Sequence, residues 1–224
     1  MGGGRPAVVT DHVLVAVANL EAGAQWIESE YGLRAVPGGR HPGAGTANMI
    51  VPLGSAYLEL IGVVDAEEAG RSPTSVRITR ALAEGRRFAA WAARTDNLDA
   101  LREQLLAAGW QLEDPRQGSR VRGDGVVLRW RTQFLAPAGA PSVLPFVIEW
   151  SVPPGMHPGE MPADHPSGAR ALRSVRLGDP DPAAASERLR SALGAGLNAS
   201  VEPALSSGVA AVEIDTPKGV VVLR

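Results

Sequence analysis

The chain has 224 residues, 45% of them hydrophobic and 21% charged, which is typical of a globular protein with one large core or two small ones. A formal net charge of -2 and the lack of a long basic run argue against binding to nucleic acid or to an anionic membrane. Because there is no cysteine, disulfides and thiolate metal sites are excluded, and any metal ligand must come from His, Asp, Glu or water.

No stretch of the sequence predicts export or membrane insertion. The N-terminus lacks the basic region and apolar core of a signal peptide, and no apolar run approaches the roughly 20 residues of a membrane span. We therefore expect a cytoplasmic protein whose partner is a small-molecule substrate or ligand, with no role for nucleic acid or a membrane. A homodimer is compatible with the sequence.

The first part of the chain predicts a strand, a helix and further strands. Residues 11–17 form a short apolar strand, and Asn19 caps a helix that stops at Gly32. Residues 37–48 are too rich in Gly and Pro for regular structure, so we expect an irregular loop there. Two strands then follow, at residues 49–53 and 57–63.

The same pattern returns twice. A second unit has a strand at 88–93, a helix that starts near Asn97 and stops at Gly109, and strands at 126–134 and 145–150. A third begins with a strand at 172–177 and continues with a helix and a hairpin. The chain thus divides into a first unit (11–64), a linker with a short helix (65–85), a second unit (86–151), a Pro-rich linker (152–171) and a third unit (172–224).

This repetition predicts an α+β fold. Each unit is a small curved sheet with one helix on its back, and its open face needs the sheet of another unit to complete a cup. We expect paired βαβββ units that form a curved, half-open cup with the helices outside. The third unit packs on that body as a related addition.

Glu59 is the most informative residue of the first unit. It lies in the apolar strand 51–64, where Tyr57, Glu59 and Ile61 share one face because side chains alternate along a strand. A carboxylate in such a strand is costly unless a cation pairs with it. The partner is either an arginine or a metal.

The repeat places a second carboxylate in the same position. When the two helix starts are aligned, Glu149 matches Glu59, and Ala90 matches His12. If the cup forms by twofold pairing, both glutamates point at one spot that His12 also reaches, and together they could bind a divalent metal. The metal-free alternative is that Arg129 and Arg131, on one face of their strand, pair with the two glutamates.

At this point the sequence resembles the vicinal oxygen chelate superfamily of glyoxalase I, bleomycin-resistance proteins and extradiol dioxygenases, and most closely its glyoxalase-like branch. The likeness covers about residues 11–157. It rests on His12, on the stretches GGRHPGAGTAN and YLELIG, on the helix after RTDNLDAL, and on LPFVIEW. These stretches are specific for the fold and not for one reaction, since members isomerise, lyse, oxygenate or only bind.

The resemblance implies a divalent metal (Zn, Ni, Mn or Fe) with His12, Glu59 and Glu149 as ligands, and Glu149 as a possible general base. The family's fourth ligand position falls on Ala90, which cannot bind a metal. The implied activity is that of a metal-dependent lyase or isomerase acting on a small metabolite with vicinal oxygens. The rival hypothesis is a non-catalytic binding protein of the same fold.

Other residues have expected roles in binding. Arg40 and His41 lie in the Gly-rich loop, and we expect one of them to face the mouth of the cup and, with Arg129 and Arg131, to contact substrate. His157 and His165 could supply a ligand if the Pro-rich linker folds back, although solvent exposure is the simpler expectation. The tryptophans of the second unit are expected mainly in the core: Trp91, Trp130 and Trp150.

Overall fold

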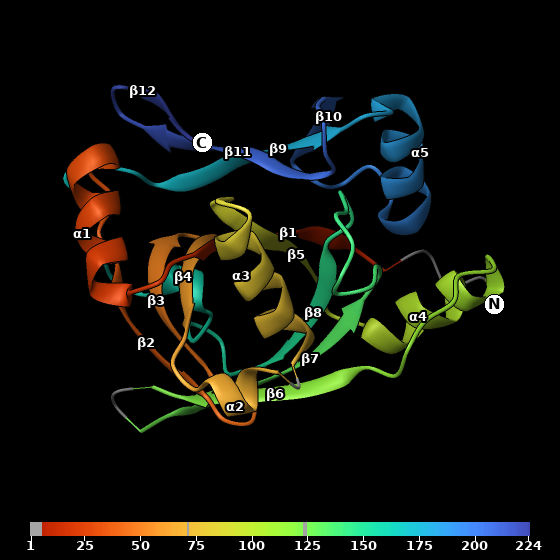
Figure 1. Cartoon of the computed structure of the whole chain (residues 1–224), viewed down its shortest axis with the longest axis horizontal. Helices are drawn as coiled ribbons and strands as arrows, with labels where there is room; N and C mark the ends of the chain where they lie inside the picture. Colours follow the sequence, from red (N-terminus) through yellow and green to blue (C-terminus); the bar gives the residue numbers. More distant parts are fainter. Residues whose placement is uncertain (1–5, 71, 123–124) are drawn as a thin grey trace.

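The computed structural model describes residues 6–70, 72–122 and 125–224 and confirms the α+β class. Eight strands form one sharply curved sheet in the order β2-β3-β4-β1-β5-β8-β7-β6, with α1 and α4 on its convex side (Figure 1). The elements of this sheet are β1 (Val8–Ala16), α1 (Leu20–Tyr31), β2 (Val36–His41), β3 (Thr46–Leu53), β4 (Ala56–Val63), β5 (Phe88–Thr95), α4 (Leu98–Ala107), β6 (Arg116–Val121), β7 (Val127–Phe134) and β8 (Phe146–Ser151).

The two halves of this sheet have the same topology. In each half the first strand pairs in parallel with the last, β1 with β4 and β5 with β8, and the two halves join through the antiparallel pair β1–β5. Both helices begin at the expected asparagines, because the side chains of Asn19 and Asn97 accept backbone N–H bonds from Ala22 and Ala100. The predicted cup of two paired units is confirmed.

The expectation of an irregular loop at 37–48 is wrong. Strands β2 and β3 form a hairpin here, and only residues 42–45 make the turn. Gly39 is needed in this hairpin because β2 passes very close to β6 at the far edge of the sheet: a Cβ on Gly39 would lie 2.6 Å from the Val121 carbonyl oxygen. The two edge strands thus nearly close the cup.

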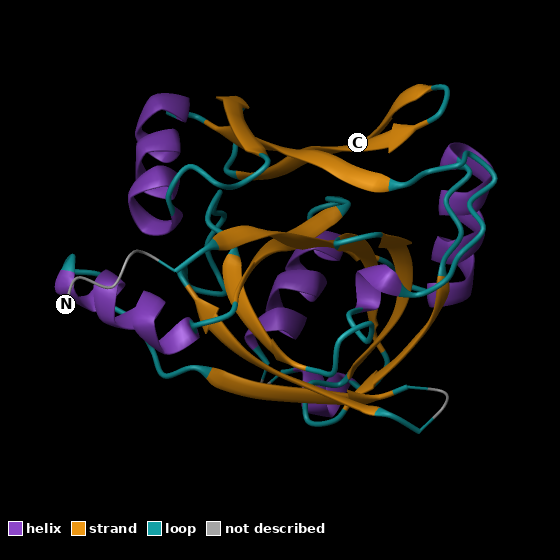
Figure 2. Cartoon of the chain, turned by 180° about the vertical axis from the view of Figure 1, so that it is seen from behind, coloured by secondary structure: helices purple, strands orange, loops and turns teal. Residues whose placement is uncertain are grey.

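The linker between the halves has regular structure and packs against the large sheet. It folds into α2 (Ala66–Ala69) and α3 (Pro73–Ala83). Ile78 and Ala81 of α3 are fully buried and pack against Leu14, Ala16 and Ile61 on the concave side of the sheet (Figures 1 and 2). This helix therefore fills one end of the cup with apolar side chains.

A second sheet covers part of the convex side of the first. Its strands run in the order β10-β9-β11-β12, and it lies across the top of the cup in Figure 1. The first strand β9 pairs in parallel with β10, directly after the helix, so the strand order differs from that of the two halves. The elements are β9 (Ala171–Asp179), α5 (Pro182–Leu193), β10 (Ala199–Pro203), β11 (Gly208–Thr216) and β12 (Gly219–Leu223).

One apolar core joins both sheets. Val13, Val15 and Trp91 on the convex side of the first sheet belong to the same buried cluster as Val175 and Val212 of the second. Across the described residues, no helix is both long and apolar enough to cross a membrane.

Candidate functional site

The concave side of the large sheet holds a cavity of about 410 Å³, which is in the range of sites for small molecules. Its lining comes from strands of both halves and from the start of α3. Three groups of side chains matter for chemistry: polar and ionisable groups (His12, His41, Asn48, Glu59, Arg120), aromatic groups (Tyr57, Trp130, Phe134, Phe146, Trp150) and aliphatic groups (Leu14, Ile61, Ile148).

A β-bulge in β1 builds the histidine side of this cavity. In the pairing of β1 with β5, Thr10 is opposite Ala93 and His12 is opposite Ala92, so Asp11 is one extra residue. Consecutive side chains on a regular strand point to opposite faces, but here His12 Nδ1 lies 2.6 Å from Asp11 Oδ1. Asp11 thereby holds the imidazole so that Nε2 faces the cavity.

Asp11 is a fully buried charge at the centre of several contacts. Its Oδ2 lies 3.0 Å from His157 Nε2, and Arg94 also donates to it at 3.4 Å. His157 Nδ1 accepts from the Gly159 backbone, so Nε2 is the donor to Asp11. Burial raises the pKa of Asp11, but hydrogen bonds and charges from the two histidines outweigh burial and hold its pKa far below the usual range.

Glu59 is buried opposite His12. Its Oε2 lies 3.5 Å from His12 Nε2, and its Oε1 accepts a hydrogen bond of 2.5 Å from Asn48 Nδ2. Asn48 is fixed in turn, because its Oδ1 accepts from the Gly39 backbone N–H. The structure therefore confirms that His12 and Glu59 meet in the cup.

His41 lies beside this pair, and Arg40 does not. His41 Nε2 accepts from Asn48 at 3.3 Å, and Nδ1 then donates to Thr46 Oγ1 at 2.8 Å. Burial lowers the pKa of His41; the charge of Glu59 raises it in part, and the charges of Arg120 and His12 lower it further. Arg40 has a side chain 57% exposed that pairs with Asp65, so only one of the two loop residues faces the cavity as expected.

Arg120 is a buried basic group of the cavity, whereas Arg116, which also lines it, is exposed. The Arg120 side chain lies on the concave face of β6, together with Gly118. In the pairing with β7, Gly118 is opposite Trp130, which also lines the cavity, and Arg120 is opposite Leu128. The side chain is 1% exposed, and neither Nη1 nor Nη2 has a hydrogen-bond partner among the described residues. Burial lowers the pKa of Arg120, and the nearby groups Tyr57 and Glu59 oppose that shift.

Aromatic rings form much of the remaining wall. His12 stacks on Tyr57 with ring centres 4.5 Å apart, and Trp130 of β7 lies 5.2 Å from Trp150 on the neighbouring strand β8. The expectation that the tryptophans are core residues is met only by Trp91, which is buried among apolar side chains and donates to the Val143 carbonyl.

Glu149 does not join the site, so its expected convergence with His12 and Glu59 is wrong. It accepts from the Leu98 backbone at the start of α4, and Arg131 donates to it at 2.8 Å on the outer side of the sheet. The metal-free alternative therefore describes Glu149 but not Glu59. Arg131 also pairs with Asp99, and Arg129 is exposed, so neither arginine lines the cavity.

The strand register explains this error. Ala92 is level with Phe146 of β8, and the side chains of Phe146 and Ile148 line the cavity, whereas Glu149 follows Ile148 and lies on the opposite face. A displacement of one residue turns a side chain to the other face of a sheet.

The donor set does not fit a resident metal. On the concave side of β5 and β8 the second half carries Ala90, Ala92, Phe146 and Ile148, whose side chains have no donor atoms. Within residues 6–70, 72–122 and 125–224, no three His, Asp or Glu side chains are arranged to hold a metal ion. An unpaired guanidinium in the same cavity disfavours a second cation there.

Two further histidines are placed differently from the expectation of solvent exposure. His157 is buried against Asp11, as described above. His165 is buried too: Nδ1 accepts from the Arg34 backbone and Nε2 donates to the Pro52 carbonyl. Neither lines the cavity. Asp11, Asn48 and Arg120 are the site residues that the sequence analysis missed, since nothing in their local pattern distinguishes them from surface groups.

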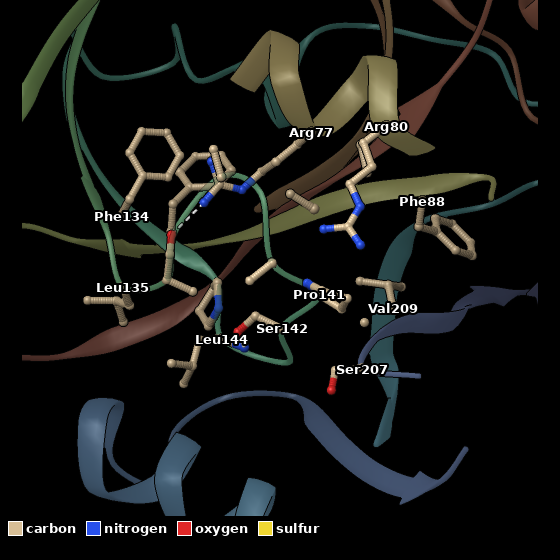
Figure 3. Close-up of a pocket in the computed structure, with 18 of the residues that line it drawn as sticks. Arg77, Arg80, Phe88, Phe134, Leu135, Pro141, Ser142, Leu144, Ser207 and Val209 are labelled. Atoms are coloured by element: carbon tan, nitrogen blue, oxygen red, sulfur yellow. Dashed lines mark hydrogen bonds between the residues drawn. The ribbon is translucent and has the colours of Figure 1, made fainter. Parts of the chain in front are cut away.

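A second pocket lies between α3, the connection from β7 to β8, and the second sheet (Figure 3). Arg77 and Arg80 of α3 point toward it, with Ser207 and Val209 on the opposite side. Its volume of about 40 Å³ is close to that of one water molecule, so it does not hold a metabolite.

Comparisons with known proteins agree with this architecture. The model of the glyoxalase-like domain family matches residues 10–193. A hypothetical protein from Staphylococcus aureus is similar in structure, with a TM-score of 0.75, 13% identity, and coverage of 97% of this chain and 99% of that one. No curated protein matches the sequence.

Methylmalonyl-CoA epimerases are more distant structural neighbours. The enzyme from Mycobacterium tuberculosis has a TM-score of 0.48 and 20% identity, over 70% of this chain and 95% of that one. A variant of the Streptomyces coelicolor enzyme in complex with 2-nitronate-propionyl-CoA has a TM-score of 0.47 and 18% identity, over 64% and 97%. On the family match, which covers residues 10–193, the chain belongs to the glyoxalase-like domain family.

Proposed function

We propose that the cup is the active site of an isomerase or lyase that moves a proton on a small metabolite with vicinal oxygens. The observation that carries this proposal is the buried series Asp11, His12 and Glu59, which faces a cavity large enough for such a substrate. A histidine oriented by a carboxylate, next to a second carboxylate, is suited to general acid–base catalysis.

Each group has a distinct task in the proposed reaction. Glu59 takes the proton from the carbon next to a substrate carbonyl, and the protonated Nε2 of His12 donates to the oxygen on which charge develops. Asp11 fixes the orientation of His12. Glu59 then returns its proton to the neighbouring carbon while the hydroxyl on the first carbon gives a proton back to His12, which completes an isomerisation with no net change in protons.

The surroundings of the pair support this assignment. Asn48 holds Glu59 by a hydrogen bond of 2.5 Å, and both Tyr57 and His41 are buried beside it. Water is thus largely excluded from the reacting groups, which strengthens the interactions of charges within the cup.

The donor atoms of the cavity do not support a metal-dependent form of this function, and the proposed proton transfer uses only side chains. The rival is a non-catalytic binding protein of the same fold. The observation that favours the rival is the aromatic wall, since Trp130 and Trp150 could hold a ligand without any reaction.

Proton exchange with solvent separates the two functions. We expect the protein to accelerate deuterium incorporation next to the carbonyl of hydroxyacetone, pyruvate or phenylpyruvate in heavy water, measured by proton NMR. Glu59→Gln should lower the rate about 100-fold or more because it removes the base. Glu28→Gln, which changes a carboxylate on α1 far from the cavity, is the matched control.

Two results would contradict the proposal. One is an exchange rate no higher than in buffer for all three compounds. The other is an accelerated rate that Glu59→Gln retains in full. Binding of any of the three compounds without exchange would support the rival function.

A further inference from the structure

The buried charge of Arg120 lacks hydrogen-bond partners for its terminal nitrogens among the described residues. Its side chain is 1% exposed, and both terminal nitrogens lack partners within the part of the chain that the structure describes. The charge of Glu59 favours the guanidinium from nearby, but that carboxylate is hydrogen-bonded by Asn48 and leaves both terminal nitrogens of Arg120 without a partner in the described ranges. An unpaired guanidinium in the interior costs free energy, and a ligand that supplies the partner removes this cost.

We propose that Arg120 binds the carboxylate of the substrate, which is a 2-oxo or 2-hydroxy monocarboxylate with an apolar or aromatic body. The choice of substrate class rests on the proposed function of the cup, whereas the binding of a carboxylate by Arg120 stands on its own.

The chemistry of the cavity favours a carboxylate over other anions. The two free nitrogens of a guanidinium match the two oxygens of a carboxylate in one plane. A phosphate dianion would bring two negative charges close to Glu59, whereas a carboxylate brings one, and of the two described arginines that line the cavity Arg116 is exposed and paired with Glu113. A 2-oxo or 2-hydroxy acid also provides the vicinal oxygen that His12 would contact.

The other residues that line the cavity indicate the chemistry of the rest of the ligand. Trp130 and Trp150 lie together on the second half of the cup, and Ile148 and Phe146 of β8 line the same cavity. Such surfaces bind apolar or flat groups. The volume of about 410 Å³ accepts an acid with a phenyl ring.

Binding of matched ligands tests the proposal without any reaction. The probes are 3-phenyllactate and its uncharged amide, 3-phenyllactamide, measured by calorimetric titration. We expect the wild type to bind the acid roughly 10- to 100-fold more tightly than the amide, and Arg120→Met to bind the two equally. Arg120→Lys keeps the charge without the paired donors and should retain part of the preference.

A control variant and a stability measurement guard against an indirect effect. Arg173→Met removes an exposed arginine paired with Asp215 on the second sheet and should leave the preference unchanged. Without ligand, Arg120→Met should melt roughly 2–8 °C higher than wild type, because the unpaired charge is gone while the apolar stem is kept.

Several outcomes would overturn the inference. These are a wild type that binds neither probe at millimolar concentration, one that shows no preference for the acid, and one in which inorganic phosphate competes more tightly than the acid. A ligand-free Arg120→Met that melts below the wild type would show that the guanidinium is structural. Absence of proton exchange, by contrast, would contradict only the proposed function.

Discussion

At the scale of single residues, Asp11 holds the two histidines His12 and His157 in place. Its carboxylate accepts from His12 on the cavity side and from His157 of the Pro-rich linker. The linker therefore contributes to the site indirectly, because it supplies a second donor that keeps Asp11 ionised. An aspartate is needed here, since an amide in this place could not balance two histidine donors.

Replacing Asp11 by asparagine should destabilise the protein strongly at neutral pH. Asparagine removes the buried charge and also replaces one carboxylate oxygen by an NH2 group, so one of the two histidines loses its acceptor, at a cost of about 3–5 kcal/mol in the free energy of unfolding. Urea unfolding measures this difference. Glu30→Gln, in which an exposed carboxylate of α1 is changed, should differ from wild type by less than about 0.5 kcal/mol.

The difference in unfolding free energy between wild type and Asp11→Asn should change with pH in one direction. The pKa of Asp11 in the folded state lies below its ordinary value of 3.8, so its stabilising contribution is present above that value and declines as the pH falls below it. The stability gap between wild type and Asp11→Asn should thus narrow from neutral pH to pH about 3. A gap that stays constant would mean that Asp11 acts by shape and not by charge.

Some residues of the site could be predicted from the sequence, and others could not. Glu59 stood out because a carboxylate in an apolar strand requires a partner, and His12 because it begins such a strand. Asp11 could not be recognised, since the bulge that turns it toward His12 has no sequence signal. Arg120 lies in a polar strand, where its burial depends on the opposite edge of the sheet.

At the scale of elements, periodicity predicted the long helices and most strands, but β6 and β10 were missed and the register between repeats was wrong. Aligning helix starts paired Glu149 with Glu59, whereas in β8 it is Ile148 that lines the cavity and Glu149 faces the outer side of the sheet. The hairpin of β2 and β3 was also missed, because its glycines were read as loop formers. They are strand residues that permit close contact with neighbouring side chains and with β6.

Gly39→Ala tests that close contact. A methyl group at this position would lie 2.6 Å from the Val121 carbonyl oxygen, so β2 and β6 would have to separate. We expect a loss of about 1–3 kcal/mol in unfolding free energy, measured by urea titration. Proton exchange should slow as well, because the Gly39 N–H positions Asn48 against Glu59.

Gly139→Ala is the appropriate comparison for this variant. It adds the same methyl group in a loop where nothing lies within 4 Å. A Gly39→Ala protein as stable as Gly139→Ala would show that the two edges of the cup separate without cost.

For the whole molecule, the asymmetry between the halves of the cup predicts its response to metals. Only the first half offers His and Glu donors to the cavity, so neither a chelator nor added Zn²⁺ or Mn²⁺ should change the melting temperature. A metal at 100 times its dissociation constant would add about 2.7 kcal/mol. A melting temperature that rises with metal in wild type but not in Glu59→Gln would restore the metal hypothesis.

The overall architecture was the most predictable feature, because the repeat of strand, helix and strands is visible at the scale of fifty residues. The division into separate units stays a prediction. The C-terminal sheet was expected as a related addition, but its strand order could not be deduced, since hydrophobic patterns do not specify which strand pairs with which.

The Pro-rich segment 152–171 has a consequence for how the chain responds to cleavage. His157 binds Asp11 and His165 binds Pro52, so the segment is fastened to the cup at both ends. The parts of the chain before and after this segment share one apolar core, because Val13 and Val212 belong to the same buried cluster. A protease that cuts between the two histidines would thus leave a nicked protein whose pieces stay together and separate only in denaturant.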